Sequence, residues 1–272
     1  HILDRWKADK VLKLVEKHQI PSIAGVSAQI ALLLNVEGFK NYDFSCVKAI
    51  VAGGGPSPPS LVRKAKEGFD APYSIRYSST ESGGIGLATS LEASEEESLY
   101  TIGKPRPGVQ AKILNEEGQP VEAGEVGELF LKTPSAMDSY WHDASNTEKF
   151  LNDGWLKTED LARKNTQGFF QLAGRTSEMF IRGGYNVYPQ EVESVLNDHP
   201  KIEQLVIAPK PHPTLGEIGV AFVVPKEPKD VCAIDELIEF GKEKLAGYKL
   251  PEEIIIVDEL PLKNGFKIDR LL

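Results

Sequence analysis

One continuous run of the chain, from Gly174 to Glu193, constrains its architecture more than any other segment. The run opens with a charged turn, continues as a short apolar strand from Met179 to Ile181, and turns at Gly183-Gly184. A proline-led, acid-rich helix start follows at Pro189. A surface loop does not need this order of parts, whereas a hinge between two domains that share one site does. The run therefore predicts two domains that meet close to residue 175.

Length and composition fit a soluble globular protein of one large or two unequal domains. The chain has 272 residues, of which 41% are hydrophobic and 26% charged, which is ordinary for proteins that bury a sizeable core. The net charge of −9 argues against a nucleic-acid partner, because such a partner favours a basic face. No apolar stretch is long enough to cross a bilayer, and the N-terminal residues lack the plan of a signal peptide. We expect a cytoplasmic protein, and the sequence leaves a homodimer open.

Cysteine and histidine usage gives no indication of a zinc site. Cys46 and Cys232 are too few and too far apart for zinc ligation or a disulfide framework, so reduced thiols are expected. The five histidines show no metal-ligand spacing. His142 and His199 are expected to be surface or packing residues.

The N-terminal part of the chain shows the alternation of a mostly parallel α/β sheet. An apolar run at Val47 to Ala52 is broken by Gly53-Gly54-Gly55-Pro56, and a basic helix follows from Pro59 to Phe69. The strand-like segment Ala71 to Tyr77 then ends at Ser78-Ser79-Thr80-Glu81. This order predicts a βαβ unit, in which ligands bind beyond the carboxyl ends of the strands, where both turns are expected. Two earlier helices are expected at Asp9 to His18 and at Ser27 to Leu34.

The remaining chain predicts an antiparallel subdomain followed by a compact α/β piece. Short strands divided by polar turns indicate a barrel-like arrangement between Gly103 and Gly174. After Arg175, helices and strands alternate, and Pro209, Pro211 and Pro213 are expected to stiffen a loop. The expected strands are Val109 to Leu114, Gly127 to Leu131, Gly168 to Leu172, Gln204 to Ala208, Val220 to Val224 and Glu253 to Val257, and the expected helices are Pro189 to Asp198 and Asp235 to Leu245.

Three segments of the chain offer groups that suit a nucleotide. A hydroxyl beside a carboxylate, as in Thr80-Glu81, can hold a phosphate oxygen and Mg²⁺. The same residues are also typical of a polar turn that caps the next helix. The glycines of Gly53-Gly54-Gly55 allow backbone to approach a flat ligand, and a plain tight turn is the alternative. The carboxylate of Asp160 can accept two hydrogen bonds from a vicinal diol, or it can belong to a surface turn.

The run from Gly174 to Glu193 resembles the junction of the adenylate-forming superfamily, which contains acyl-CoA synthetases, firefly luciferase and the adenylation domains of peptide synthetases. The wording Gly-Gly-Tyr-Asn-Val-Tyr-Pro is closest to the fatty acyl-CoA ligases. The resemblance covers essentially the whole chain. It implies an enzyme that activates a small-molecule carboxylate with ATP and Mg²⁺ and passes the acyl group to the thiol of CoA.

The resemblance also implies roles for residues of the first two motifs. Tyr77-Ser78-Ser79-Thr80-Glu81 matches the family's aromatic-Gly-x-Thr-Glu, with Ser78 in place of glycine. Tyr77 would pack on adenine, Thr80 would contact phosphate and Glu81 would bind the metal, while Ser78 and Ser79 complete the nucleotide-binding turn. The turn Gly53-Gly54-Gly55-Pro56 matches a Gly-Gly-Ala-Pro-like turn that lines the adenine pocket. Gly55 replaces its alanine.

Two more motifs complete the implied nucleotide site. Trp155 to Asp160 resembles the family's Trp-x-x-Thr-Gly-Asp, whose Asp accepts both ribose hydroxyls. Glu159 stands where the family has glycine, and this departure costs strain if the turn needs a positive φ. Arg175 is implied to reach the ribose and phosphate side. Ser177 stands at the pivot position for domain rotation, where the family usually has Asp or Lys.

The C-terminal segment resembles the family's Pro-x-Thr-x-x-Gly-Lys-Ile-x-Arg loop. Alignment through Lys267-Ile268-Asp269-Arg270 gives Lys267 the role of the lysine that bridges the substrate carboxylate and the α-phosphate. Phe266 then replaces the usual glycine. The turn Gly183-Gly184 is implied to face CoA in the second half-reaction.

The family's phosphate loop, which ends in Pro-Lys-Gly, is absent from the 272 residues. The chain is therefore expected to be the C-terminal half of a longer enzyme and to be weak or inactive by itself. Residues 1–175 would be the end of the large AMP-binding domain, and residues 176–272 a mobile lid. A peptide-synthetase-type adenylation domain, a luciferase-like oxygenase and a non-catalytic nucleotide-binding remnant remain as alternatives.

Overall fold

The computed structural model describes residues 5–260, 262–263 and 267–268, and the side chains only up to residue 260. The chain divides into two compact units. We call them the N-terminal unit (His1–Lys112, Phe130–Thr158 and Asn165–Gln171) and the C-terminal unit (Ile113–Leu129, Glu159–Lys164 and Leu172–Leu272). The boundary that the sequence predicts between residues 175 and 176 stays a prediction.

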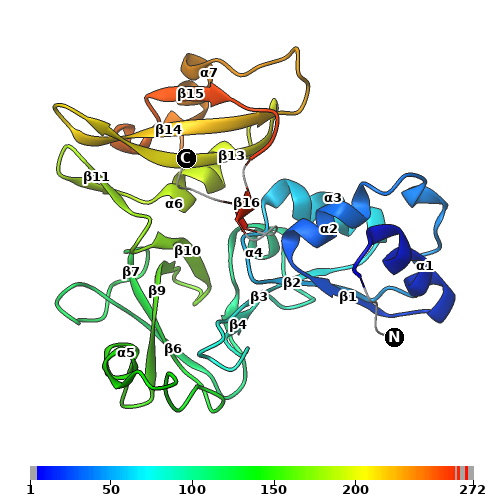
Figure 1. Ribbon diagram of the computed structural model, residues 1–272, viewed down its shortest axis with the longest axis horizontal. Helices are drawn as coiled ribbons and strands as arrows, with labels where there is room; N and C mark the ends of the chain where they lie inside the picture. Colours follow the sequence, from blue (N-terminus) through cyan, green and yellow to red (C-terminus); the bar gives the residue numbers. More distant parts are fainter. Residues whose placement is uncertain (1–4, 261, 264–266, 269–272) are drawn as a thin grey trace. The chain divides into compact units, whose positions relative to one another are not determined.

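The N-terminal unit contains the expected parallel sheet, so the predicted α/β fold is confirmed. Its strands lie in the order β1-β2-β3-β4-β5, with β1, β2 and β3 parallel and β4 and β5 antiparallel. Helices α2 and α3 connect the parallel strands, and Figure 1 shows them next to each other. The elements of this part are α1 (Ala8–His18), β1 (Ser22–Gly25), α2 (Ser27–Leu34), η1 (Phe39–Asn41), β2 (Ala49–Gly53), α3 (Pro59–Phe69), β3 (Tyr73–Tyr77), β4 (Leu87–Ala88), α4 (Glu95–Tyr100) and β5 (Lys104–Pro105).

Local sequence explains where these helices begin and end. Helix α3 starts with Pro59, whose fixed φ and missing N–H suit the first helical position. It ends at Asp70, which has a left-handed backbone with φ 48°. The side chains of Val62 and Phe69 are buried beneath it together with Ile50 of β2, and burying side chains of this size stabilises the fold by about 1.5–3 kcal/mol each.

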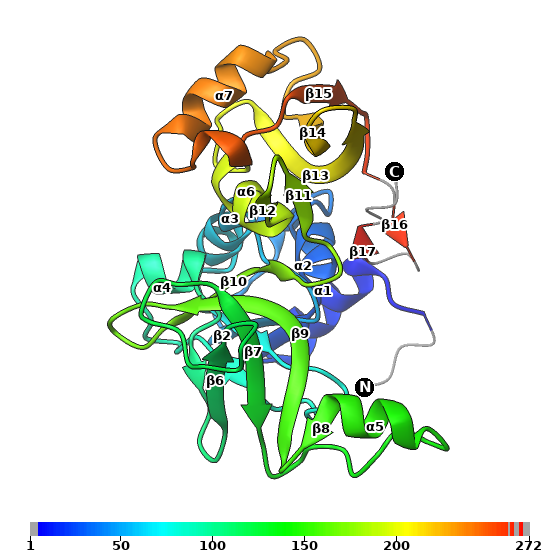
Figure 2. The same ribbon diagram turned by 90° about the vertical axis from the view of Figure 1, so that its left-hand side faces the viewer.

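The antiparallel, barrel-like sheet that the sequence predicts is also present. Its strand order is β10-β9-β7-β6, and β8 pairs with β9. The long strand β9 was not predicted, because Lys157 to Asp160 form a polar run that hides its alternation. Figure 2 shows β9 beside β7. The elements are β6 (Gln110–Leu114), β7 (Gly127–Lys132), α5 (Ala144–Phe150), β8 (Leu151–Asn152), β9 (Trp155–Lys164) and β10 (Phe170–Arg175).

The C-terminal unit holds a third sheet with the order β12-β11-β14-β13, in which β15 runs parallel to β14. Side chains of α6 and α7 form one buried core with those of β13 and β14, among them Val192, Leu196, Ile207 and Leu237. The elements are β11 (Phe180–Arg182), β12 (Tyr185–Val187), α6 (Pro189–Leu196), β13 (Ile202–His212), β14 (Gly216–Pro225), α7 (Ile234–Lys242), η2 (Gly247–Lys249), β15 (Glu253–Ile256), β16 (Leu262–Lys263) and β17 (Lys267–Ile268).

The expected proline loop is wrong in part. Pro209 and Pro211 belong to β13, where they lie opposite Gly219 and Glu217 of β14. Strand β13 is the last in its sheet order, and proline is tolerated there because an outer strand does not need every N–H as a donor. Only Pro213 lies in the turn that follows.

Candidate functional site

The two turns expected to form a nucleotide site lie side by side. Gly53, at the end of β2, is the register partner of Arg76 in the parallel strand β3, and Tyr77 is the last residue of β3. A Cβ on Gly53 would stand 2.8 Å from the backbone oxygen of Arg76, and Gly54 has φ 76°. Glycine therefore avoids a steric clash at Gly53 and left-handed backbone strain at Gly54. The carboxyl ends of the two strands bring Gly53-Gly54-Gly55-Pro56 next to the turn after Tyr77.

The turn after β3 is closed by its own hydroxyl groups. The N–H of Ser79 donates to Ser82 Oγ at 3.0 Å, and the N–H of Ser82 donates to Ser79 Oγ at 3.1 Å. Thr80 is exposed. Ser78 is not among the residues with positive φ in the described part of the chain, so its replacement of the family's glycine carries no left-handed strain.

The carboxylate of Glu81 has an aromatic partner that the sequence did not indicate. The hydroxyl of Tyr140 donates to Glu81 Oε1 at 3.0 Å, and the N–H of Met137 donates to the backbone oxygen of Glu81 at 2.8 Å. These contacts help to fix the position of the residue. Carboxylate and hydroxyl oxygens are the hard donors that Mg²⁺ takes beside phosphate oxygens, so Glu81 and Thr80 fit such an ion.

In the C-terminal unit, Asp160 of β9 and Arg175 of β10 form an ion pair. Arg175 Nε donates to Asp160 Oδ1 at 2.8 Å. Asp160 is almost fully buried, whereas the side chain of Arg175 is half exposed. The guanidinium holds the carboxylate in one orientation. An ionised carboxylate still has capacity for further donors, such as ribose hydroxyls.

Glu159, which stands where the family has glycine, has a left-handed backbone conformation. Its φ is 59°, in the left-handed region that costs a residue with a Cβ about 1–2 kcal/mol. The backbone N–H of Thr176 donates to the carbonyl oxygen of Glu159 at 3.0 Å, and Thr176 Oγ1 donates to it at 3.3 Å. These bonds attach the turn to the segment after Arg175.

The hinge candidate and the double-glycine turn follow directly. Ser177 is exposed, just after β10. Gly183 and Gly184 connect β11 and β12 with φ 57° and 88°. Among the described residues, apart from the two chain neighbours, no heavy atom lies within 4 Å of a Cβ placed on Gly184, which leaves room for a ligand to approach the backbone there.

Lys267 lies in β17, and its backbone pairs with Lys263 of β16. Its side chain and the neighbouring Phe266 are outside the described residues. Thr80 belongs to the N-terminal unit and Asp160 to the C-terminal unit.

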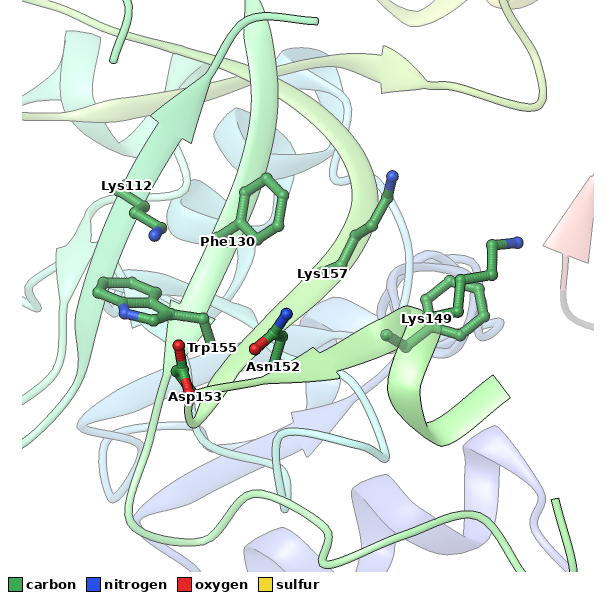
Figure 3. Close-up of a pocket in the computed structure, with 8 residues that line it drawn as sticks. Lys112, Phe130, Lys149, Asn152, Asp153, Trp155 and Lys157 are labelled. Atoms are coloured by element: carbon green, nitrogen blue, oxygen red, sulfur yellow. The ribbon is translucent and has the colours of Figure 1, made fainter. Parts of the chain in front are cut away.

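One cavity of about 280 Å³ lies on the N-terminal unit beside the Trp155 motif. Figure 3 shows Trp155, Phe130 and Lys112 at this pocket, and Lys112 Nζ lies 4.2 Å from the centre of the Trp155 ring. None of the predicted nucleotide residues lines it. The lining residues are Lys112, Phe130, Lys149, Phe150, Asn152, Asp153, Trp155 and Lys157.

Comparisons with known proteins agree with the motifs. The family model of the AMP-binding enzymes matches residues 1–141, and that of the AMP-binding enzyme C-terminal domain matches residues 191–267. The chain belongs to the adenylate-forming, AMP-binding enzyme superfamily. Its relatives there include acyl-CoA ligases.

Three relatives illustrate the match. A long-chain-fatty-acid–CoA ligase of Haemophilus influenzae is 33% identical over 95% of this chain and 45% of that protein. The structure of o-succinylbenzoate CoA synthetase from Bacillus subtilis with its acyl-adenylate has a TM-score of 0.82, 33% identity, and coverage of 98% and 53%. The amide bond synthetase McbA from Marinactinospora thermotolerans has a TM-score of 0.92, 28% identity, and coverage of 99% and 55%.

The chain spans about half the length of the curated relatives it matches. No helix in the described part of the chain is long and apolar enough to cross a membrane.

Proposed function

We propose that this chain is part of an AMP-forming acyl-CoA ligase that activates a fatty or related apolar carboxylic acid. In the first half-reaction the carboxylate attacks the α-phosphate of ATP, which forms acyl-AMP and releases pyrophosphate. In the second, the thiol of CoA attacks the acyl carbon and releases AMP. The fatty-acid ligase among the relatives and the wording of the run from Gly183 to Pro189 support this class of acid.

The N-terminal unit supplies the adenine and phosphate contacts of the proposal. Tyr77 packs against the adenine ring, and the turn Gly53-Gly54-Gly55-Pro56 approaches it through backbone, since glycine brings no side chain between. Thr80 contacts a phosphate oxygen, and Ser78 and Ser79 complete the nucleotide-binding turn. Glu81 holds Mg²⁺, which screens the negative charge of the phosphates.

Asp160 and Arg175 serve the ribose. The ion pair between them at 2.8 Å supports this proposal most directly, since it presents a buried, oriented carboxylate at the motif position. Asp160 accepts hydrogen bonds from the two ribose hydroxyls, and Arg175 reaches the phosphate side. Lys267 contributes the cation that offsets the charge developing at the α-phosphate.

The second half-reaction requires a rearrangement of residues 176–272 as a lid. Ser177, exposed after β10, is the pivot, because hinges are short segments that absorb changes in φ and ψ. Rotation carries Lys267 away and brings the Gly183-Gly184 turn to the pantetheine thiol. The open space at Gly184 suits such an approach.

The deciding experiment is exchange of labelled pyrophosphate into ATP by the protein in its full natural length, with a series of carboxylic acids. Exchange that depends on an apolar acid is expected, and the Asp160→Ala variant should lose it. Absence of exchange with every acid would contradict the proposal. Calorimetry with AMP on residues 1–272 alone tests the non-catalytic alternative. In that alternative the nucleotide binds, but no carboxylic acid of any length supports exchange.

The acceptor of the acyl group is a separate question, because McbA is an amide bond synthetase. We propose CoA as the acceptor, because the backbone of the Gly183-Gly184 turn leaves space for the pantetheine thiol. Acyl-AMP supplied together with CoA, an amine or a carrier-protein thiol distinguishes the three acceptors by the product formed. Consumption only with the amine or the carrier protein would replace CoA.

A further inference from the structure

Three potential metal ligands that are far apart in sequence meet in the C-terminal unit. His199 lies in the turn between α6 and β13, Cys232 lies two residues before α7, and Glu236 lies in the first turn of α7. The Sγ atom of Cys232 is 3.8 Å from His199 Nε2, and Nε2 is 3.7 Å from Glu236 Oε1. One ligand atom of each residue lies within 4.8 Å of the other two. The sequence spacing gave no sign of this cluster.

The two separations that involve His199 are close to those of a tetrahedral zinc site, whereas the three donor atoms together are confined only to within 4.8 Å of one another. Zn–S bonds of about 2.3 Å and Zn–N bonds of about 2.0–2.1 Å, at a tetrahedral angle, separate sulfur and nitrogen by about 3.6 Å. The corresponding nitrogen–oxygen separation is about 3.3 Å. The Cys232–His199 pair is already at this spacing to within a few tenths of an ångström, and Glu236 needs a small movement. Its side chain is 39% exposed and has room to make it.

The surroundings hold the donors in place and provide negative charge. His199 and Cys232 are buried, and the ring of Phe240 packs edge-on against His199, with ring centres 4.9 Å apart. Lys201 Nζ lies 3.1 Å from both Glu236 Oε2 and Asp230 Oδ1. An ammonium group thus already occupies the acidic side of the cluster, where a dication would compete with it.

We propose that His199, Cys232 and Glu236 bind one Zn²⁺ ion. Thiolate, imidazole and carboxylate are the three ligand types that zinc takes in proteins. Binding releases the thiol proton to solvent, since the thiolate is the ligand. Water or the carboxylate of Asp230 completes the tetrahedron. The site is independent of the proposed nucleotide chemistry, and it ties the start of α7 to the turn before β13.

Zinc coordination changes one hydrogen bond of His199. The backbone N–H of Lys201 donates to Nδ1 at 3.3 Å, so the neutral ring carries its proton on Nε2. Coordination through Nε2 needs the other tautomer, in which Nδ1 carries the proton. The bond given up is long for its type, and the zinc–nitrogen bond replaces it.

The test uses tag-free protein, competition for Zn²⁺ with a chromogenic chelator, and Co²⁺ as a spectroscopic probe. We expect one zinc per chain and a near-ultraviolet charge-transfer band with cobalt that marks a metal–thiolate bond. Cys232→Ser should abolish the band and weaken zinc binding about 100-fold or more, since loss of a ligand's hydrogen-bond partner alone weakens binding about 10–100-fold. Cys46→Ser is the matched control, because Cys46 lies in the N-terminal unit, and it should bind as the wild type does.

Lys201→Ala supplies a second, independent measurement. Removing the ammonium that competes for Glu236 should strengthen zinc binding, whereas a cluster that serves only packing would show no change. Circular dichroism of each variant establishes that it is folded. Equal zinc affinity of wild type and Cys232→Ser, or a cobalt spectrum without the thiolate band, would overturn the proposal.

Discussion

The ammonium group of Lys249 lies 2.8 and 2.7 Å from the two carboxylate oxygens of Glu191. Glu191 is in the first turn of α6 and almost fully buried, and Lys249 ends η2. A second cation, Arg163, reaches the same carboxylate at 3.6 Å. The buried carboxylate thus links α6 to η2 and to β9 through two ion pairs.

Removal of Lys249 should destabilise the protein strongly. Lys249→Met leaves the buried carboxylate with only the longer contact to Arg163, and breaking a buried pair costs about 3–5 kcal/mol. Urea unfolding measures the loss. Lys242→Met is the control, because its pair with Glu239 is exposed and should contribute little. Equal losses in the two variants would show that burial adds nothing to the Lys249 pair.

Replacing Glu159 by glycine should stabilise the fold. The left-handed φ of 59° costs glutamate about 1–2 kcal/mol, and glycine relieves this at an entropic cost of about 0.4–1 kcal/mol in the unfolded chain. A net gain of between about 0 and 1.6 kcal/mol is expected in thermal or urea unfolding. Lys157→Gly, in the same strand without positive φ, should be destabilising. A loss in both variants would show that Glu159 is not strained.

Lys267→Ala should impair acyl-adenylate formation on the order of 10²-fold or more, the scale of losing one oriented electrostatic contact. Thioester formation from presynthesised acyl-AMP should be largely preserved, because the proposed lid rotation would take Lys267 out of the site. Lys263→Ala, at the register partner in β16, is the matched control and should keep both steps. Equal slowing of both half-reactions by Lys267→Ala would contradict the rotating lid.

Gly184→Val should give the opposite pattern, with adenylation retained and thioester formation lost, because the new side chain would fill the space in which the thiol is proposed to approach. Gly124→Val is a suitable control. Gly124 also has a positive φ and open space around its Cβ position. Valine there therefore introduces a similar backbone strain without affecting the proposed contact with CoA. Stopped-flow or single-turnover assays of each half-reaction separate the effects, and identical behaviour of the two variants would leave strain as the cause.

The hinge should be visible to a protease. Trypsin is expected to cut first after Arg175, since Arg175, Thr176 and Ser177 are all exposed, and ATP with the acid should change the rate. Mass spectrometry of early fragments identifies the cut. Slow cleavage that starts elsewhere and ignores ligands would argue against a pivot at Ser177.

Much of the fold could be predicted because local signals and packing agree. The pattern over α2 and α3 gave both helices with their observed bounds, since apolar spacing and the proline at the start of α3 favour the same structure. The parallel pairing of β2 and β3 followed from their order with a helix between. Ser177, Lys267 and the domain boundary remain predictions.

What the sequence did not indicate depends on contacts between distant residues. The hydroxyl of Tyr140 meets Glu81 across 59 positions of sequence, and His199 meets Cys232 across 33. No local periodicity encodes such pairs. Strand β9 (Trp155–Lys164) was missed for a different reason, because the polar run from Lys157 to Asp160 interrupts the alternation that marks a strand.

The two prolines within β13 have a consequence for the protein in a crowded cell. Pro209 and Pro211 stand on the outermost strand of the C-terminal sheet and have no N–H to offer. A foreign strand that docked along this side would find donors missing at two alternate positions, so a continuous ladder could not form. These prolines therefore protect the sheet against association with unfolded chains, at positions where the pairing with β14 remains intact.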